Sequence, residues 1–291
     1  MTSSPRRVHW MAARPPRRDP IDDGGDIAVG ADDLVVLASV YKLPLLVALC
    51  RAFESGELSP TATVRINPAD CTPGPTGVST FRDRGAELAG SGAVDDDRVR
   101  QRRRRPRSRQ VGLESVERAL SELGMTSTRI IGGTADAHRS LVIDAHAHTT
   151  AEAFAALADN DEAWTVSAYD PSYASATTPR EMTSLLDAIW TGRAVPGPQG
   201  EFVRHVMSAQ IWQHRIRSGF PYSEVDVAGK TGTIGAIRNE VAVVTFPGET
   251  PVAVAVFTRA ARTDPVLPVV DAAIGHAARI AVTELRSGRV D

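Results

Sequence analysis

The chain has little of three features that define whole classes of protein. Its 291 residues include only two cysteines, Cys50 and Cys71, too few for a disulfide framework. Cys50 lies on the apolar face of an expected helix, where we expect a buried thiol. No apolar run approaches the roughly 20 residues that a membrane-spanning helix needs. The net charge of −2 gives no general attraction to nucleic acid or to a membrane, so we expect neither as a partner.

An apolar stretch is also missing from the N-terminus. Residues 1–20 are rich in arginine and proline, and Pro15 and Pro16 stand where the apolar part of a secretory signal would follow Arg6 and Arg7. We therefore predict that residues 1–20 form a disordered N-terminal segment and that the protein, as written, stays in the cytoplasm.

Lysine is the scarcest charged residue. The sequence has two lysines, Lys42 and Lys230, and every other basic side chain except histidine is arginine. An arginine cannot lose its proton in a protein, whereas a desolvated lysine can become a base. Lys42 comes three residues after Ser39, at the start of a helical pattern that ends at Gly56, so the two side chains share one helix face. A capped amphipathic helix with a lysine at that position would give the same pattern.

The second lysine opens the segment Lys230-Thr231-Gly232-Thr233, which precedes a β-type pattern. Ser-x-x-Lys near the N-terminus together with Lys-Thr-Gly on a late strand is the paired signature of penicillin-recognising serine enzymes. Residues 177–182, Thr-Thr-Pro-Arg-Glu-Met, are similar to the TTP-x-x-M segment of the same family. On these motifs the chain resembles class A β-lactamases and penicillin-binding proteins over residues 26–285.

The resemblance implies an α/β (α+β) fold, in which helices flank an antiparallel sheet and a second, all-helical subdomain is present. We expect a single β-lactamase-like domain over residues 21–291. Its α/β part would comprise residues 21–38 and 222–291, and its helical part residues 39–221.

Hydrophobic periodicity and terminal signals place the individual elements. Thr178, Pro179 and Glu181 have the spacing of a capping box at a helix start. A tight turn is expected at residues 22–25. Helices are expected over residues 39–56, 113–123, 151–158, 178–192, 202–219 and 267–285, and strands over residues 26–29, 61–66, 241–246 and 252–257.

The family's chemistry assigns a role to each residue of the serine and lysine motifs. Ser39 would be the nucleophile, and neutral Lys42 would take its proton. Lys230 would be the nearby cation that lowers the pKa of Lys42. It would also attract the carboxylate that substrates of this family carry. The reaction would be acyl transfer from a β-lactam or D-Ala-D-Ala-like amide to the serine, followed by hydrolysis of the ester.

The residues after Lys230 are expected to bind the substrate. Thr231 would hydrogen-bond the substrate carboxylate, and Arg238 would assist as a bidentate partner. Gly232 would let the strand backbone lie close to the substrate. By resemblance, the backbone N–H groups of Ser39 and Thr233 would form the oxyanion hole.

Two parts of the family's machinery are missing. The sequence has no Ser-Asp-Asn loop between the first two helices. It also lacks the Glu-x-x-x-Asn segment whose glutamate activates the deacylating water, since neither Glu152 nor Glu162 has an asparagine four residues later. A catalytically defective protein that only binds such ligands is therefore the alternative to a working hydrolase.

The missing loop coincides with an arginine-rich segment, residues 88–110. It contains an acidic triplet and no interleaved aromatics, so we interpret it as a solvated loop rather than a nucleic-acid site. A shift of one nucleotide, with suitable codons, would turn residues 98–102 into Val-Ser-Asp-Asn. We therefore hypothesise that the segment is translated out of frame, which the nucleotide sequence can test.

An unrelated resemblance remains open. Residues 141–148, Leu-Val-Ile-Asp-Ala-His-Ala-His, are similar to the first strand of metal-dependent amidohydrolases. From a strand, His146 and His148 would point the same way and could share a metal. On the alternative interpretation they are surface histidines on a loop. In our main prediction the protein needs no metal and no cofactor. We expect it to be a monomer and to act on a small molecule.

Overall fold

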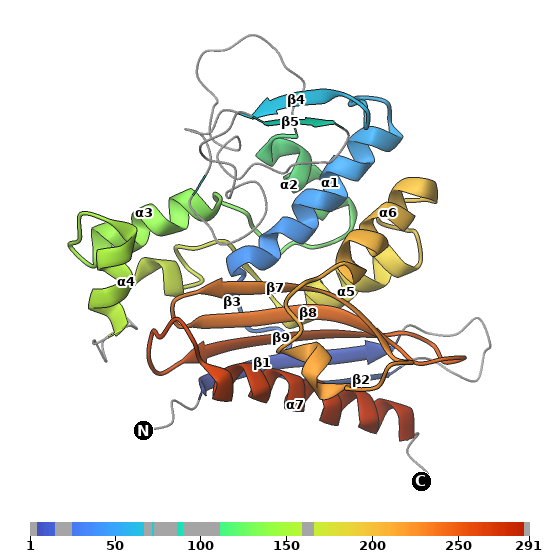
Figure 1. Cartoon of the computed structure of the whole chain (residues 1–291). Coiled ribbons are helices and arrows are strands. Elements are labelled where there is room, and N and C mark those ends of the chain that lie inside the picture. Colours follow the sequence, from blue (N-terminus) through green and yellow to red (C-terminus); the bar gives the residue numbers. More distant parts are fainter. Residues whose placement is uncertain are drawn as a thin grey trace.

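A computed structural model describes residues 5–14, 25–66, 72, 86–89, 111–158 and 166–287. Its centre is a five-stranded antiparallel sheet in the order β2-β1-β9-β8-β7 (Figure 1). Helices cover both faces of this sheet. The strands are β1 (Pro5–Arg14), β2 (Gly25–Val29), β7 (Asp226–Ile234), β8 (Ile237–Thr245) and β9 (Val252–Ala260).

Strands β8 and β9 form the middle of the sheet because their valine- and alanine-rich sequences can be buried on both faces. Every residue of β8 except Thr245 is buried, and every residue of β9 except Arg259. The two strands are paired with Val241 opposite Ala255, and Gly248 lies in the connecting turn at a φ of 75°. This confirms the strands predicted over residues 241–246 and 252–257, which form a hairpin of strands buried on both faces.

The prediction of a disordered N-terminal segment is wrong for residues 5–14. They form β1, which inserts between β2 and β9 and places Trp10 opposite both Val29 and Val256. The apolar residues Met11 and Ala12 are buried there. The arginines and prolines dominated the composition and obscured this short apolar stretch. The rest of residues 1–20, and residues 22–24 of the predicted tight turn, lie outside the described residues.

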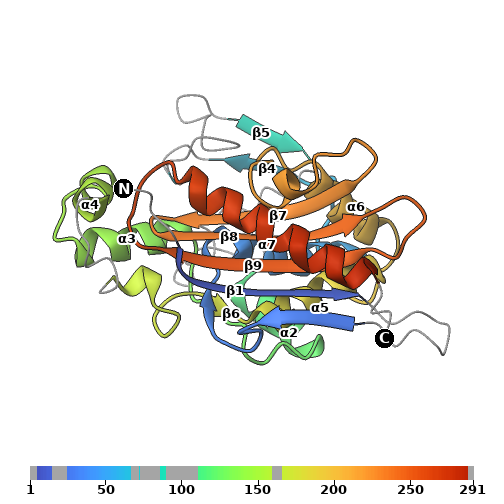
Figure 2. The same ribbon diagram turned by 90° about the horizontal axis from the view of Figure 1, so that it is seen from below.

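One face of the sheet is covered by the long helix α7 (Pro268–Ser287), which runs across the strands (Figure 2). Ile274, Ala278 and Val282 of this helix are buried against Val244 and Val254 of the sheet, within one cluster. Their spacing of four residues keeps them on one helix face. The predicted closing helix at residues 267–285 is thereby confirmed.

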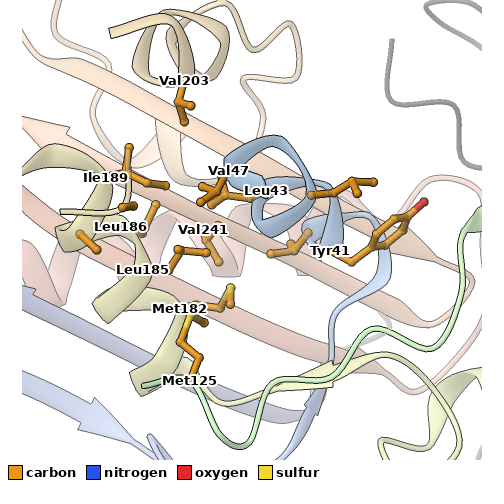
Figure 3. Packing of buried hydrophobic residues seen from close by; sticks show 14 of the residues in the cluster. Tyr41, Leu43, Val47, Met125, Met182, Leu185, Leu186, Ile189, Val203 and Val241 are labelled. Carbon is orange, nitrogen blue, oxygen red and sulfur yellow. The ribbon is translucent and has the colours of Figure 1, made fainter. Parts of the chain in front are cut away.

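The opposite face carries the larger core, in which Leu43 and Val47 of α1 meet Leu185 and Ile189 of α5 (Figure 3). Val241 of β8 closes this core from the sheet side. Each fully buried leucine contributes on the order of 1.5–3 kcal/mol relative to exposure. The helices on this side are α1 (Lys42–Glu54), α2 (Leu113–Glu122), α5 (Pro179–Trp190) and α6 (Gly197–Ser208).

Helix α5 begins as predicted, with a modified cap. The Thr178 hydroxyl accepts a hydrogen bond from the Glu181 backbone N–H at 3.1 Å, and Pro179 occupies the first turn. The Glu181 carboxylate does not return to the cap but accepts from the Ser127 backbone N–H at 2.8 Å. Half of the capping box is therefore used to tie α5 to the segment that follows α2.

Two sequence predictions in the helical part are wrong. Residues 141–144, expected as a strand under the metal interpretation, end the helix α3 (Thr134–Asp144). The helix expected up to Gly219 stops at Ser208, and exposed Ile211 and Trp212 lie in the loop beyond it.

The remaining elements are β3 (Val35–Val36), η1 (Ala38–Tyr41), β4 (Thr63–Ile66), β5 (Ala86–Ala89), α4 (Thr150–Ala158), η6 (Ser167–Tyr169), β6 (Ala176–Thr177) and η7 (Ile216–Gly219). None of the helices within the described ranges is long and apolar enough to cross a membrane.

Candidate active site

Ser39 lies in η1, a single 3₁₀ turn that leads directly into α1. The residue before it, Ala38, has a φ of 44°, in the left-handed region that residues other than glycine rarely adopt. The preceding Leu37 is buried and accepts a hydrogen bond from the Val40 N–H at 3.1 Å. Ser39 is thus a first-turn residue, as predicted, but its hydroxyl caps neither η1 nor α1.

The turn that carries Ser39 is fixed to the sheet by Asn239 of β8. The side-chain amide of this fully buried residue donates to the carbonyl oxygens of Val36 at 2.7 Å and Leu37 at 3.2 Å. Its amide oxygen accepts from the Thr258 N–H at 3.2 Å. The position of the Ser39 turn is therefore set by the central strands β8 and β9.

Strand β7 is an edge strand of the sheet, and η1 packs against it. Gly232 allows this approach, because a Cβ atom there would lie 2.7 Å from the Leu37 carbonyl oxygen and 3.0 Å from Cγ2 of Val40. The glycine was predicted to let the strand lie close to a substrate. In the structure it lets the strand lie close to the turn that holds Ser39.

Substituting Gly232 by alanine should therefore separate β7 from η1. A Cβ contact of 2.7 Å with a backbone oxygen requires backbone movement, so we expect a loss of about 1–3 kcal/mol in the free energy of unfolding, the range for overpacked sites. Urea denaturation measures this loss. Gly112→Ala is the comparison, because Gly112 has open space around it and a φ of −96° that alanine adopts without strain. A Gly232→Ala protein as stable as the wild type would contradict the prediction.

The two lysines are brought close enough to influence each other. Burial lowers the pKa of Lys42. The pKa of Lys230 is lowered to about 8, chiefly by burial and then by the charge of Lys42, while Glu240 acts in the opposite direction. The Lys230 ammonium donates to the Thr231 carbonyl oxygen at 2.6 Å. The motifs predicted that Lys230 lowers the pKa of Lys42, but in the structure burial lowers the pKa of Lys42, and the charge effect is that of Lys42 on Lys230.

Arg215, which the sequence analysis missed, organises the end of β7. Only 2% exposed, it donates to the Thr233 hydroxyl at 2.7 Å, to the Gly232 carbonyl oxygen at 2.9 Å and to the Asn239 carbonyl oxygen at 2.8 Å. Its Nε donates to the Asp271 carboxylate of α7 at 2.7 Å. No motif marks it in the sequence, because residue 215 lies within the helix predicted over residues 202–219, whereas α6 ends at Ser208.

Arg238 lies opposite Thr233 in the sheet register, but its guanidinium is directed elsewhere. It donates to the carbonyl oxygens of Asp264 and, at 3.3 Å, of Pro265, in the loop after β9. Thr231, its predicted co-ligand, is buried with 7% exposure. The arginine that contacts the Thr233 hydroxyl is therefore Arg215, and a role of Arg238 toward a carboxylate stays a prediction.

A cavity of about 230 Å³ opens beside Ser39. Ser39, Tyr41 and Thr233 line one side of it, and α3 lines the other with Asp136 and His138. The remaining lining is largely apolar and includes Val36, Ile131, Ala137, Ala168, Tyr173 and Ile234. The structure thus brings the predicted nucleophile and Thr233 to one cavity, while neither lysine is among the lining residues.

The amidohydrolase interpretation is not supported by the geometry around residues 141–148. The strand that it requires is the end of α3, and exposed His146, at a φ of 51°, and exposed His148 follow in a turn. No group of three potential metal ligands occurs among the residues that the structure describes. Glu152 of α4 accepts from the His148 backbone N–H at 2.9 Å. Glu162 and residues 90–110 lie outside the described residues, so what was predicted for them stays a prediction.

The antiparallel sheet flanked by helices, with a serine turn packed on the edge strand, defines the β-lactamase/transpeptidase-like fold class. The chain belongs to the Beta-lactamase enzyme family, whose sequence model matches residues 18–88 and 107–285. It is therefore a member of the serine hydrolase superfamily that the motifs predicted. The interruption of the match falls in the arginine-rich segment, and the reading-frame hypothesis for that segment stays a prediction.

Individual relatives agree with this assignment. The chain is 26% identical over 265 residues to the β-lactamase regulatory protein BlaB of Streptomyces cacaoi, covering 81% of this chain and 80% of BlaB. A β-lactamase from Sphaerobacter thermophilus has a similar structure, with a TM-score of 0.69, 20% identity and coverage of 97% and 92% of the two chains. A PBP-A mutant, solved as an acyl-enzyme complex with penicillin G, has a TM-score of 0.69 at 16% identity, with coverage of 97% and 90%.

Proposed function

We propose that the protein is a serine hydrolase that is acylated at Ser39 by a β-lactam or a D-Ala-D-Ala-like amide. The observation that carries this proposal is the position of Ser39 on a cavity beside the edge strand β7, with two lysines of lowered pKa nearby. A lysine of lowered pKa can be neutral at working pH and can remove the serine proton.

The acylation step follows from these positions. Lys42 takes the proton of the Ser39 hydroxyl as its oxygen attacks the amide carbon, and the backbone N–H groups of Ser39 and Thr233 stabilise the oxyanion. The amide C–N bond then breaks, and its nitrogen takes up the proton that Lys42 received from Ser39. Lys230 attracts the substrate carboxylate, with the Thr233 hydroxyl held in place by Arg215.

A second candidate function is that of a β-lactam receptor that keeps the ester instead of releasing it. Two observations favour it: the Ser-Asp-Asn loop and the deacylating glutamate are absent from the sequence, and the relative from Streptomyces cacaoi is named a regulatory protein. A general base is worth about 10²–10⁴-fold in rate, so release of the ester without one is slow. Both candidates share acylation of Ser39.

Incubation with a fluorescent penicillin followed by intact-mass and peptide mass spectrometry tests the shared step. We expect one adduct, located on Ser39 and absent from Ser39→Ala. Ser172→Ala, which changes an exposed serine on a turn, should label like the wild type. A folded wild-type protein without any adduct would refute acylation, and the persistence of the adduct distinguishes receptor from hydrolase.

Acylation should depend on pH through the lysines. Because the pKa of Lys230 is lowered to about 8, its ammonium loses its charge as the pH rises through 8, and attraction of the substrate carboxylate is lost. The second-order rate of adduct formation should therefore fall above pH 8. Lys230→Arg keeps its charge throughout this range and should remove the fall. The same alkaline fall in Lys230→Arg would assign it to another group.

A further inference from the structure

Helix α3 forms the wall of the cavity that faces Ser39. Its first turn lies near the N-terminal end of α1, and α4 packs against α3 at the outer edge of the molecule (Figure 1). Its first residue is tied to the serine turn, because the Tyr41 hydroxyl accepts a hydrogen bond from the Thr134 N–H at 3.2 Å. His138 is four residues after Thr134 and so lies on the same face of α3. Both His138 and Ser39 line the cavity.

The His138 side chain is positioned without a hydrogen bond to another described residue. Its ring packs edge-on against Phe154 of α4, with centroids 5.8 Å apart and an interplanar angle of 87°. Its Cα lies one helical turn from that of Thr134, which is held by Tyr41. The half-buried imidazole therefore packs against an aromatic ring and belongs to the lining of the cavity that also contains Ser39.

The protonation state of His138 suits a base. Burial lowers its pKa, and the charge of Lys42 lowers it further. The groups around it are Tyr41 and Lys42 from η1 and α1, Asp136 and Arg139 on α3 itself, and Phe154 from α4. Asp136 is engaged by the Gly133 N–H at 3.1 Å and by Arg139 at 3.2 Å. A neutral imidazole therefore faces the cavity near neutral pH.

We propose that His138 is the general base that activates the water which hydrolyses the Ser39 ester. This inference rests on the proposed acylation of Ser39. It assigns a base to the hydrolysis of the ester, the step for which the family uses a glutamate that this sequence lacks. A water between the imidazole and the ester carbonyl gives one proton to His138 as its oxygen attacks the carbonyl carbon. The tetrahedral intermediate then breaks its bond to Ser39 Oγ, which takes up the proton that His138 received from the water, and the acid leaves.

The experiment follows the loss of the adduct. Wild type and His138→Gln are labelled with a fluorescent penicillin, separated from free label, and sampled by intact-mass spectrometry over time and pH. We expect adduct formation within about threefold of the wild type and adduct loss slowed by about 10²-fold or more. Wild-type loss should slow as acid protonates His138, whereas loss from His138→Gln should not follow this titration. Added imidazole should accelerate loss from His138→Ala.

The control and the outcomes separate the two proposals. His146→Gln, which changes an exposed histidine just beyond α3, should lose its adduct at the wild-type rate. Adduct loss at the wild-type rate from His138→Gln would overturn the role of His138. A wild-type adduct that never decays would also overturn it while leaving acylation of Ser39 standing. No adduct on the folded wild type would overturn both proposals.

Discussion

Replacing Lys42 by methionine is expected to slow acylation of Ser39 by a fluorescent penicillin by about 10²–10⁴-fold, the usual worth of a general base. Methionine keeps the length and the apolar stem of the side chain but has no proton acceptor of comparable strength. Lys42 is half-buried and its pKa is lowered by that burial, so in the wild type it can act as a neutral base. Stopped-flow fluorescence of adduct formation measures the rate.

Lys42→Arg gives the sharper comparison, because arginine keeps the positive charge but cannot lose its proton. If the lysine acts as a base, both variants should be slow. If its charge alone matters, Lys42→Arg should react at close to the wild-type rate. Labelling of Lys42→Met within threefold of the wild type would remove Lys42 from the acylation step.

Replacing Arg215 by methionine is expected to lower the free energy of unfolding by about 3–5 kcal/mol, the cost of leaving one partner of a buried ion pair alone. Asp271, with 7% exposure, would lose the guanidinium that donates to it at 2.7 Å. The carbonyl oxygens of Gly232 and Asn239 would lose their donor as well. Urea denaturation with linear extrapolation measures the loss.

Two further variants show how much of the stability loss in Arg215→Met comes from the buried ion pair. Arg193→Ala removes an exposed pair with Asp187 and should cost about 0–1 kcal/mol. The double variant Arg215→Met with Asp271→Leu removes both buried charges and should recover part of the loss, because no uncompensated carboxylate remains. An Arg215→Met protein as stable as Arg193→Ala would show that the buried network contributes little.

The same arginine links stability to the proposed chemistry. Its contact with the Thr233 hydroxyl joins the end of β7 to α7 on the other face of the sheet. Loosening this contact should shift Thr233, one of the two proposed oxyanion donors, relative to Ser39. Acylation by Arg215→Met should therefore be slower even under conditions in which the variant is fully folded.

Much of the fold was predictable because its elements carry local signals. The central strands were recognisable from continuous valine and alanine runs, and α5 from the Thr178 cap and Pro179. Gly124 and Gly192, at φ angles of 74° and 76°, follow the ends of α2 and α5, where a glycine in the left-handed region commonly stops a helix. The N-terminal strand was missed because its apolar residues are few, and its stability comes from β2 and β9, which are distant in sequence.

The sequence by itself determined the serine, the two lysines and Gly232, because each belongs to a short motif whose spacing is fixed by one turn or one strand. Tertiary structure alone decided what surrounds them. The pairing of Arg215 with Asp271 joins residues 56 positions apart, and the approach of α3 to the serine turn joins Tyr41 to Thr134 across 93 positions. Such contacts depend on the order of strands in the sheet and on helix packing, which no local pattern records. The same packing brings His138 to the cavity beside Ser39.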